Sequence, residues 1–152
     1  YDDLALTFAI DYPRFSVFMQ EDSEGLTMNE AKTLATDNLM REGWVPPVNV
    51  EPTPVGDLLL FEYHDREFNY QLFIDHYVKQ HLQPYFFFSL PAKTHALVYM
   101  PTKEDPFASA QVLMMMKQAT VNMFQQLGHN ISPQIYVYDN GEIRSFEKGM
   151  FN

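Results

Sequence analysis

Cysteine is absent from this 152-residue sequence, and its six glycines are scattered along the chain. Without cysteine the chain forms no disulfide, has no thiol nucleophile and offers no thiolate to a zinc ion. Without a glycine cluster it has no phosphate-binding loop. No apolar run approaches the roughly 20 residues that a membrane-spanning helix needs, and the start shows no signal-peptide pattern. We therefore expect a soluble, cytoplasmic protein with no membrane association.

Positive charge is also scarce, because 10 lysines and arginines stand against 20 aspartates and glutamates, for a net charge of −10. Residues 1–75 hold 15 of the acids and 4 of the bases, whereas residues 76–152 are nearly neutral. Nucleic-acid binding needs cations that replace the counterions of the phosphates, so we expect no nucleic acid as a partner. The acidic half suits a basic protein partner, solubility alone, or a mimic of nucleic acid that blocks a nucleic-acid-binding protein.

Catalytic spacing is a third absence. The five histidines include none in an HExxH or HxH arrangement, and no serine lies in a nucleophile-elbow pattern. His76 and His81 are five residues apart and do not share a helical face. We therefore expect neither a metal nor a cofactor. An uncharacterised hydrolase stays an alternative, with a site in which the fold brings His81 together with the carboxylates Asp65 and Asp75.

What the sequence does contain is an aromatic stretch followed by a long helical pattern. Residues 85–90 and 95–100 are apolar runs of strand length around a turn at 91–94, which predicts a buried hairpin. Asp105 and Pro106 then begin a helix that ends at Gly128, since aspartate caps free N–H groups and proline fits the first helical position. The predicted apolar face of this helix consists of Phe107, Ala110, Leu113, Met114, Met116, Val121, Met123, Phe124 and Leu127.

The N-terminal part of the sequence predicts a hairpin and a second helix. Alternating apolar residues on either side of 11–13 indicate two strands joined by a turn. Thr27 and Glu30 have the spacing of a capping box, which predicts a helix that starts at Met28 and ends near Arg41.

Four prolines in residues 44–56 predict an extended crossover, and residues 58–63 predict one further strand. A third helix is expected over 69–82, and Asp139-Asn140-Gly141 predicts a tight turn between two final strands. The result is a single α+β domain spanning residues 1–152. It has a mostly antiparallel sheet with three helices, in the order ββαβ-α-ββαββ.

Several short motifs occur in one order along most of the chain. They are Leu26-Thr27, Ala35-x-x-Asn38-Leu39, Leu90-Pro91 followed by Ala96-Leu97-Val98, and Ile131-Ser132-Pro133 before Tyr136-Val137-Tyr138-x-x-Gly141. In this order they resemble the C-terminal part of the YtpQ-like bacterial family, domain of unknown function 1444. The resemblance supports the helix over 69–82. It also implies that an N-terminal segment of such proteins is missing here, through truncation or in a shorter relative. It brings no established activity.

Each of the three expected helices carries one polar residue within its apolar face: Asn38, His81 and Lys117. If the helices pack on one face of the sheet, these residues converge in a polar cluster, because a buried polar group without a partner costs roughly 1–3 kcal/mol. In the alternative arrangement Lys117 extends to solvent, His81 lies at a helix end, and Asn38 bonds to nearby backbone.

Met115 is the candidate interface residue, because it falls on the polar side of its helix between Met114 and Met116. Methionine side chains repack easily against varied partners. The functional hypothesis is therefore a non-catalytic protein-binding or regulatory module, whose partner is another protein or a second copy of the chain.

Overall fold

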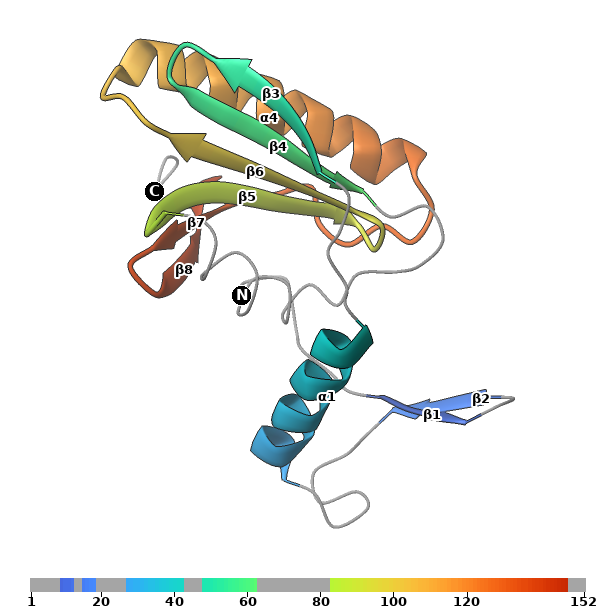
Figure 1. Cartoon of the computed structure of the whole chain (residues 1–152). Coiled ribbons are helices and arrows are strands. Elements are labelled where there is room, and N and C mark those ends of the chain that lie inside the picture. The colour runs from blue at the N-terminus through green and yellow to red at the C-terminus, as the bar shows by residue number, and fades with distance from the viewer. Residues whose placement is uncertain (1–8, 13–14, 19–26, 43–47, 63–82, 148–152) are drawn as a thin grey trace. The chain divides into compact units, whose positions relative to one another are not determined.

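The structure, a computed structural model, describes residues 9–12, 15–18, 27–42, 48–62 and 83–147 (Figure 1). The chain divides into two compact units, which are Ala5–Val45 and Tyr1–Leu4 with Pro46–Asn152. The smaller unit holds a hairpin and a helix, and the larger unit holds a six-stranded sheet and a helix. That the whole chain behaves as a single domain stays a prediction.

The smaller unit begins with a hairpin of β1 (Ala9–Tyr12) and β2 (Phe15–Phe18), which pair antiparallel as expected. Helix α1 (Met28–Glu42) follows, and its start has the predicted cap, because the backbone N–H of Glu30 donates to Thr27 Oγ1 at 3.2 Å. This bond satisfies one of the free N–H groups of the first helical turn. The predicted position of the helix is therefore confirmed.

One prediction for α1 is wrong. Asn38 is exposed rather than placed in a buried stripe, and Leu34 is 46% exposed, while Ala31 is buried. Ala31, the buried residue, has a small side chain that specifies burial weakly. The amide of Asn38 consequently has access to solvent and needs no buried partner.

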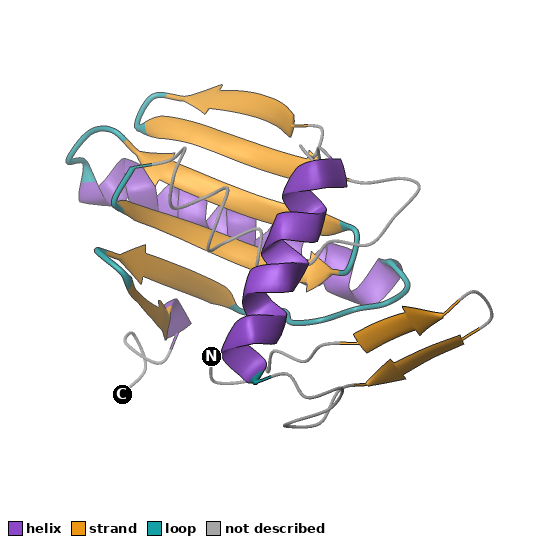
Figure 2. Ribbon diagram, turned by 60° about the horizontal axis from the view of Figure 1, so that its bottom comes forward, coloured by secondary structure: helices purple, strands orange, loops and turns teal. Residues whose placement is uncertain are grey.

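The larger unit is an antiparallel sheet in the order β3-β4-β6-β5-β7-β8, with α4 (Pro106–Gln126) across one face (Figures 1 and 2). Its strands are β3 (Val48–Thr53), β4 (Gly56–Glu62), β5 (Tyr85–Ala92), β6 (His95–Pro101), β7 (Ile135–Asp139) and β8 (Glu142–Ser145). The expected α+β class and antiparallel sheet are confirmed. The described residues contain two helices, and the third helix, expected over 69–82, lies outside them.

The prediction of an extended crossover over residues 44–56 is wrong, since Val48–Thr53 forms strand β3. The predicted order of elements along the chain, ββαβ-α-ββαββ, is therefore wrong at this point, because the hairpin of β3 and β4 follows α1 where one strand was expected. Pro52 is tolerated because, among the described strands, β3 pairs only with β4 and lies at the edge of the sheet, where a missing N–H breaks no second ladder. Gly56 begins β4 with φ = 143°, and a Cβ there would collide with the backbone carbonyl of Met100.

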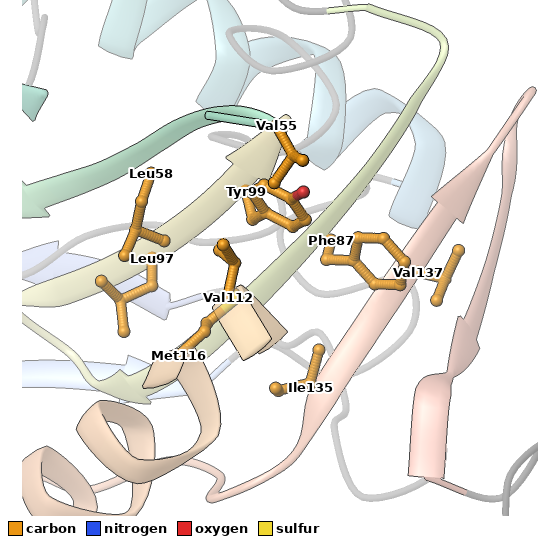
Figure 3. Packing of buried hydrophobic residues seen from close by; sticks show 9 residues of the cluster. All are labelled: Val55, Leu58, Phe87, Leu97, Tyr99, Val112, Met116, Ile135 and Val137. Atoms are coloured by element: carbon orange, nitrogen blue, oxygen red, sulfur yellow. The ribbon is translucent and has the colours of Figure 1, made fainter. Parts of the chain in front are cut away.

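The core lies between α4 and the sheet (Figure 3). Asp105 caps the helix as predicted, since its side chain accepts from the backbone N–H of Ala108 at 3.0 Å, and Pro106 follows it. The buried residues of this layer are Val55, Leu58, Phe87, Leu97, Tyr99, Val112, Met116, Ile135 and Val137. They come from β4 and its preceding turn, β5, β6, β7 and α4, so the central hairpin and the long helix do form one packed layer.

The second face of the sheet is buried as well. Phe86, Phe88 and Val98 are at most 1% exposed although they alternate with residues that face α4. Phe86 stacks on Tyr138 with ring centroids 4.7 Å apart, and Phe88 stacks on Tyr136 at 5.4 Å. Burial on both faces explains why β5 reads as a continuous apolar run rather than an alternating one.

Candidate functional site

Helix α4 turns a different side to the sheet than its apolar pattern predicts. Val112, Met116 and Thr120 are its buried residues, at four-residue spacing. Phe107 and Met114 were expected in the buried face, but they are 76% and 73% exposed. At about 100° per residue, these two lie roughly 160–180° around the helix from Met116.

Two hydroxyl pairs, one of them buried and one part-buried, account for the rotation. Thr120 Oγ1 lies 2.7 Å from Ser89 Oγ of β5 and also donates to the carbonyl of Met116 at 2.7 Å. The hydroxyl of Tyr99 lies 3.0 Å from Ser109 Oγ. These pairs hold polar positions of α4 against the sheet, because separating a buried hydroxyl from its partner costs more than exposing a methionine. Phe107 and Met114 therefore face outward although both are apolar.

The outward residues form what we call the α4 outer patch, defined as Phe107, Ala110, Gln111, Met114 and Met115. The expected exposure of Met115 is confirmed at 55%. Beyond the patch the exposed face continues with Gln118, Asn122, Gln125 and Gln126, so no exposed residue of α4 is charged. In a chain with a net charge of −10, this face is a neutral surface with an apolar end and an amide-rich end.

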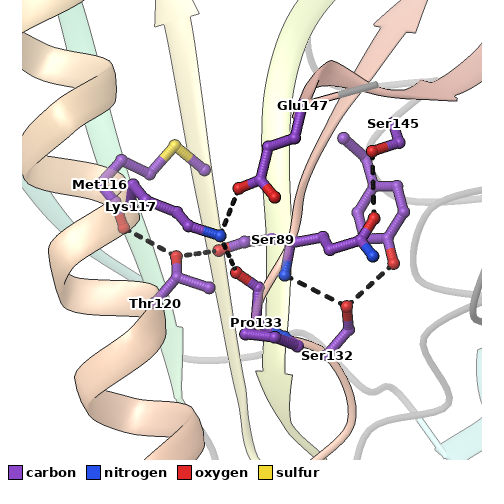
Figure 4. A network of polar contacts seen from close by, with 10 residues as sticks. Ser89, Met116, Lys117, Thr120, Ser132, Pro133, Ser145 and Glu147 are labelled. Carbon is purple, nitrogen blue, oxygen red and sulfur yellow. Dashed lines mark hydrogen bonds and ion pairs between the residues drawn. The ribbon is translucent and has the colours of Figure 1, made fainter. Parts of the chain in front are cut away.

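Lys117 is the one charged residue of α4, and it is engaged within the fold (Figure 4). Its Nζ donates to the carbonyl oxygen of Pro133 at 2.6 Å and forms an ion pair with Glu147. The side chain therefore ties α4 to the loop before β7 and to the segment after β8. The sequence placed Lys117 in the apolar face, and it is indeed half-buried, with its ammonium paired.

The structure does not test whether the other members of the expected polar cluster lie near Lys117. Asn38 belongs to the smaller unit and is exposed, and His81 lies outside the described residues. The candidate carboxylates Asp65 and Asp75 also lie outside them. The shared cluster of Asn38, His81 and Lys117, and the hydrolase alternative, thus stay predictions.

A chain of a hydroxyl, an imidazole and a carboxylate is the arrangement in the structure that most resembles a catalytic one. Thr94 Oγ1 lies 2.7 Å from His95 Nδ1, and His95 Nε2 lies 3.4 Å from Glu62 Oε1. The second distance exceeds the roughly 2.7–2.9 Å of a strong charge-assisted bond. Thr94 and His95 are neighbours at the turn between β5 and β6, and Glu62 is the register partner of His95. Local pairing in the hairpin accounts for this chain of contacts.

Neither a metal site nor a membrane span is found in the part of the chain that the structure describes. No group of three or more His, Asp or Glu side chains there could hold a metal ion. None of its helices is long and apolar enough to cross a membrane. Comparisons with protein-family models, with curated proteins and with solved structures found no match. The candidate site is therefore the α4 outer patch, which the geometry of the chain itself defines.

Proposed function

We propose that this protein is a non-catalytic protein-binding module and that it docks its partner on the α4 outer patch. The observation that carries the proposal is the exposure of three large apolar side chains, Phe107 at 76%, Met114 at 73% and Met115 at 55%. Aromatic residues and methionine are enriched in the buried cores of protein interfaces. Methionine also adapts its shape to the surface that it meets.

The surroundings of the patch support the same role. Interfaces combine a core depleted in charge with a polar rim. The exposed side of α4 carries no charged residue, and its amide side chains continue from Gln118 to Gln126. Glu104 and Asp105 are exposed at the other end of the patch, so polar groups bound it along the helix axis on both sides.

We also propose that the chain is related to the YtpQ-like bacterial family, a relation that implies no particular activity. A binding or regulatory module fits a chain whose conspicuous surface feature is apolar. We favour it over a hydrolase because the buried hydroxyls of Ser89 and Thr120 pair with each other and with a backbone carbonyl. Such pairing orients a helix, whereas hydrolysis needs a base beside the nucleophile. The contacts of His95 with Thr94 and Glu62 are explained by local pairing in the hairpin.

The test is affinity capture with matched variants. Phe107→Ser combined with Met114→Ser removes the apolar side chains, whereas Asn122→Ser combined with Gln125→Ser changes exposed residues of the same helix outside the patch. All four side chains are exposed, so each double variant is expected to keep the native unfolding midpoint to within a few degrees.

Proteins that the native chain captures from cells that produce it are expected to fall more than tenfold with the patch variant and to persist with the control. Tenfold corresponds to about 1.4 kcal/mol, less than the loss of two interface anchors. Equal capture by both variants would overturn the proposal.

A further inference from the structure

Two apolar residues of the α4 outer patch lie symmetrically about its central glutamine, and this arrangement concerns its occupant. Gln111 lies at the centre, with Phe107 four residues before it and Met115 four residues after it. At about 100° per residue, Phe107, Met114 and Met115 all point within roughly 60° of Gln111. A helix surface with apolar residues on both sides of a central position is suited to meet itself in the antiparallel direction.

We infer that a second copy of this chain occupies the patch, with two α4 helices packed antiparallel about a two-fold axis through Gln111; the inference rests on the proposed function. In a two-fold contact, the residue at position i faces the one at 222 − i, a register that follows from placing the axis at Gln111. Phe107 of one protomer then packs beside Met115 of its partner, and the reverse contact repeats on the other side. The two Gln111 amides meet at the axis, where each offers both a donor and an acceptor.

Charge favours this occupant over a basic protein. A chain with a net charge of −10 repels its own copy wherever acidic surfaces face each other. The patch has no charged side chain, so two copies meet there without like charges in contact, and a basic partner gains no ion pair on it. Along the chain, the acids nearest to the patch are Glu104 and Asp105, just before the helix.

The antiparallel direction keeps those acids apart. Glu104 lies seven residues from the axis, so the two Glu104 residues are about 21 Å apart along the pair at a rise of 1.5 Å per residue. The Debye length is about 8 Å at physiological salt, so this repulsion is screened. A parallel pair would set the same residues side by side. Contact through one helix face buries less than standard interfaces, so the dimer is expected to dissociate with a Kd on the order of 10 µM or weaker.

Because the chain has no cysteine, one introduced thiol reports the geometry. Gln111→Cys is expected to cross-link as a disulfide dimer on mild oxidation, since the two thiols meet at the axis. Gln125→Cys is the matched control, because it lies on the same exposed face but its two copies are roughly 42 Å apart along the axis. The Gln111→Cys protein is expected to cross-link more than tenfold faster, and adding Phe107→Ser and Met114→Ser is expected to remove this advantage.

Sedimentation equilibrium of the native chain from about 5 to 500 µM measures the dimer without cross-linking. A native chain that stays monomeric throughout, or equal cross-linking rates for the two cysteine variants, overturns the inference. A dimer that persists with Phe107→Ser and Met114→Ser also overturns it, since another face would then mediate it. If the chain is monomeric while capture of other proteins still depends on the patch, the second copy is excluded and the proposed function stands. If the chain is monomeric and capture of other proteins does not depend on the patch, both proposals are wrong.

Discussion

Ser89 and Thr120 are fully buried hydroxyl residues within an otherwise apolar layer. Thr120 gives its proton to the carbonyl of Met116, so Ser89 is the donor in the 2.7 Å contact between the two hydroxyls. Each hydroxyl therefore has its hydrogen directed at a partner. The pair joins β5 to α4 in one defined rotation of the helix.

This geometry predicts unequal effects of two substitutions. Thr120→Val leaves the buried Ser89 hydroxyl without an acceptor and is expected to lower the free energy of unfolding by about 2 kcal/mol. Ser89→Ala leaves Thr120 bonded to Met116 and is expected to cost about 1 kcal/mol. The double variant is expected to cost less than the sum, because no unpaired hydroxyl remains. Urea unfolding measures all three, and additive losses would show that the two hydroxyls do not interact.

At the residue scale, sequence reasoning located the capping residues and missed the hydroxyl pair. Asp105 and Thr27 cap their helices through neighbours three residues away, so local spacing reveals them. Ser89 and Thr120 are 31 residues apart. A serine within an aromatic run and a threonine within a helix are the only signals in the sequence, and neither identifies its partner.

At the scale of elements, Lys117 connects α4 with two segments near the C-terminal hairpin. Glu147 Oε1 is shielded from water and has Lys117 as its partner. The side chain of Lys117 is 36% exposed and that of Glu147 is 29% exposed. Lys117→Met removes the ion pair and the hydrogen bond to the Pro133 carbonyl. We expect a loss of about 1 kcal/mol in the free energy of unfolding, a modest value because solvent reaches both side chains.

A variant at Glu147 and a change of salt concentration separate the contribution of the ion pair from that of the hydrogen bond to Pro133. Glu147→Gln keeps the bond to Pro133 and is expected to cost about half as much as Lys117→Met in urea titrations. The loss from Glu147→Gln should shrink at 1 M salt, because screening weakens ion pairs between partly exposed groups. If Lys117→Met has no effect on stability, the connection between these elements contributes nothing to the fold.

The sequence predicted neither the position of β3 at the edge of the sheet nor the rotation of α4 about its own axis. The prolines of residues 44–56 correctly indicated that no central strand forms there, but they did not exclude an edge strand, which accepts Pro52. The apolar pattern of α4 identified a helix and its ends, yet three successive methionines at 114–116 allow several buried faces. Contacts with β5 and β6 selected the face that buries Met116 and exposes Met114.

At the scale of the whole molecule, the six-stranded sheet carries buried side chains on both of its faces. Phe88 is 1% exposed and stacks on Tyr136, whereas Phe107 on α4 is 76% exposed. Phe88→Ala is expected to lower the free energy of unfolding by about 3–5 kcal/mol, because it removes a buried ring and leaves a cavity. Phe107→Ala is the matched control and should change it by about 0.5 kcal/mol or less.

Denaturant titration followed by circular dichroism measures both changes, and the milder Phe88→Leu serves if the alanine variant does not fold. Equal losses at positions 88 and 107 would show that the second face of the sheet is not buried. Hydrogen exchange on the Phe88→Leu protein also tests the single-domain prediction, since one cooperative domain requires amides of α1 and α4 to lose protection together. Unchanged protection in α1 would mean that the two units unfold separately.

The sequence by itself determined the features that depend on near neighbours. These are the caps of α1 and α4, the central hairpin, and the final turn, where Asn140 and Gly141 adopt the positive φ that such residues tolerate. Tertiary structure alone decided that β3 forms an edge, that both faces of the sheet are buried, and that Phe107 and Met114 face outward. These outcomes depend on contacts between segments distant in the sequence, whose energies exceed the differences among the faces that one helix could bury.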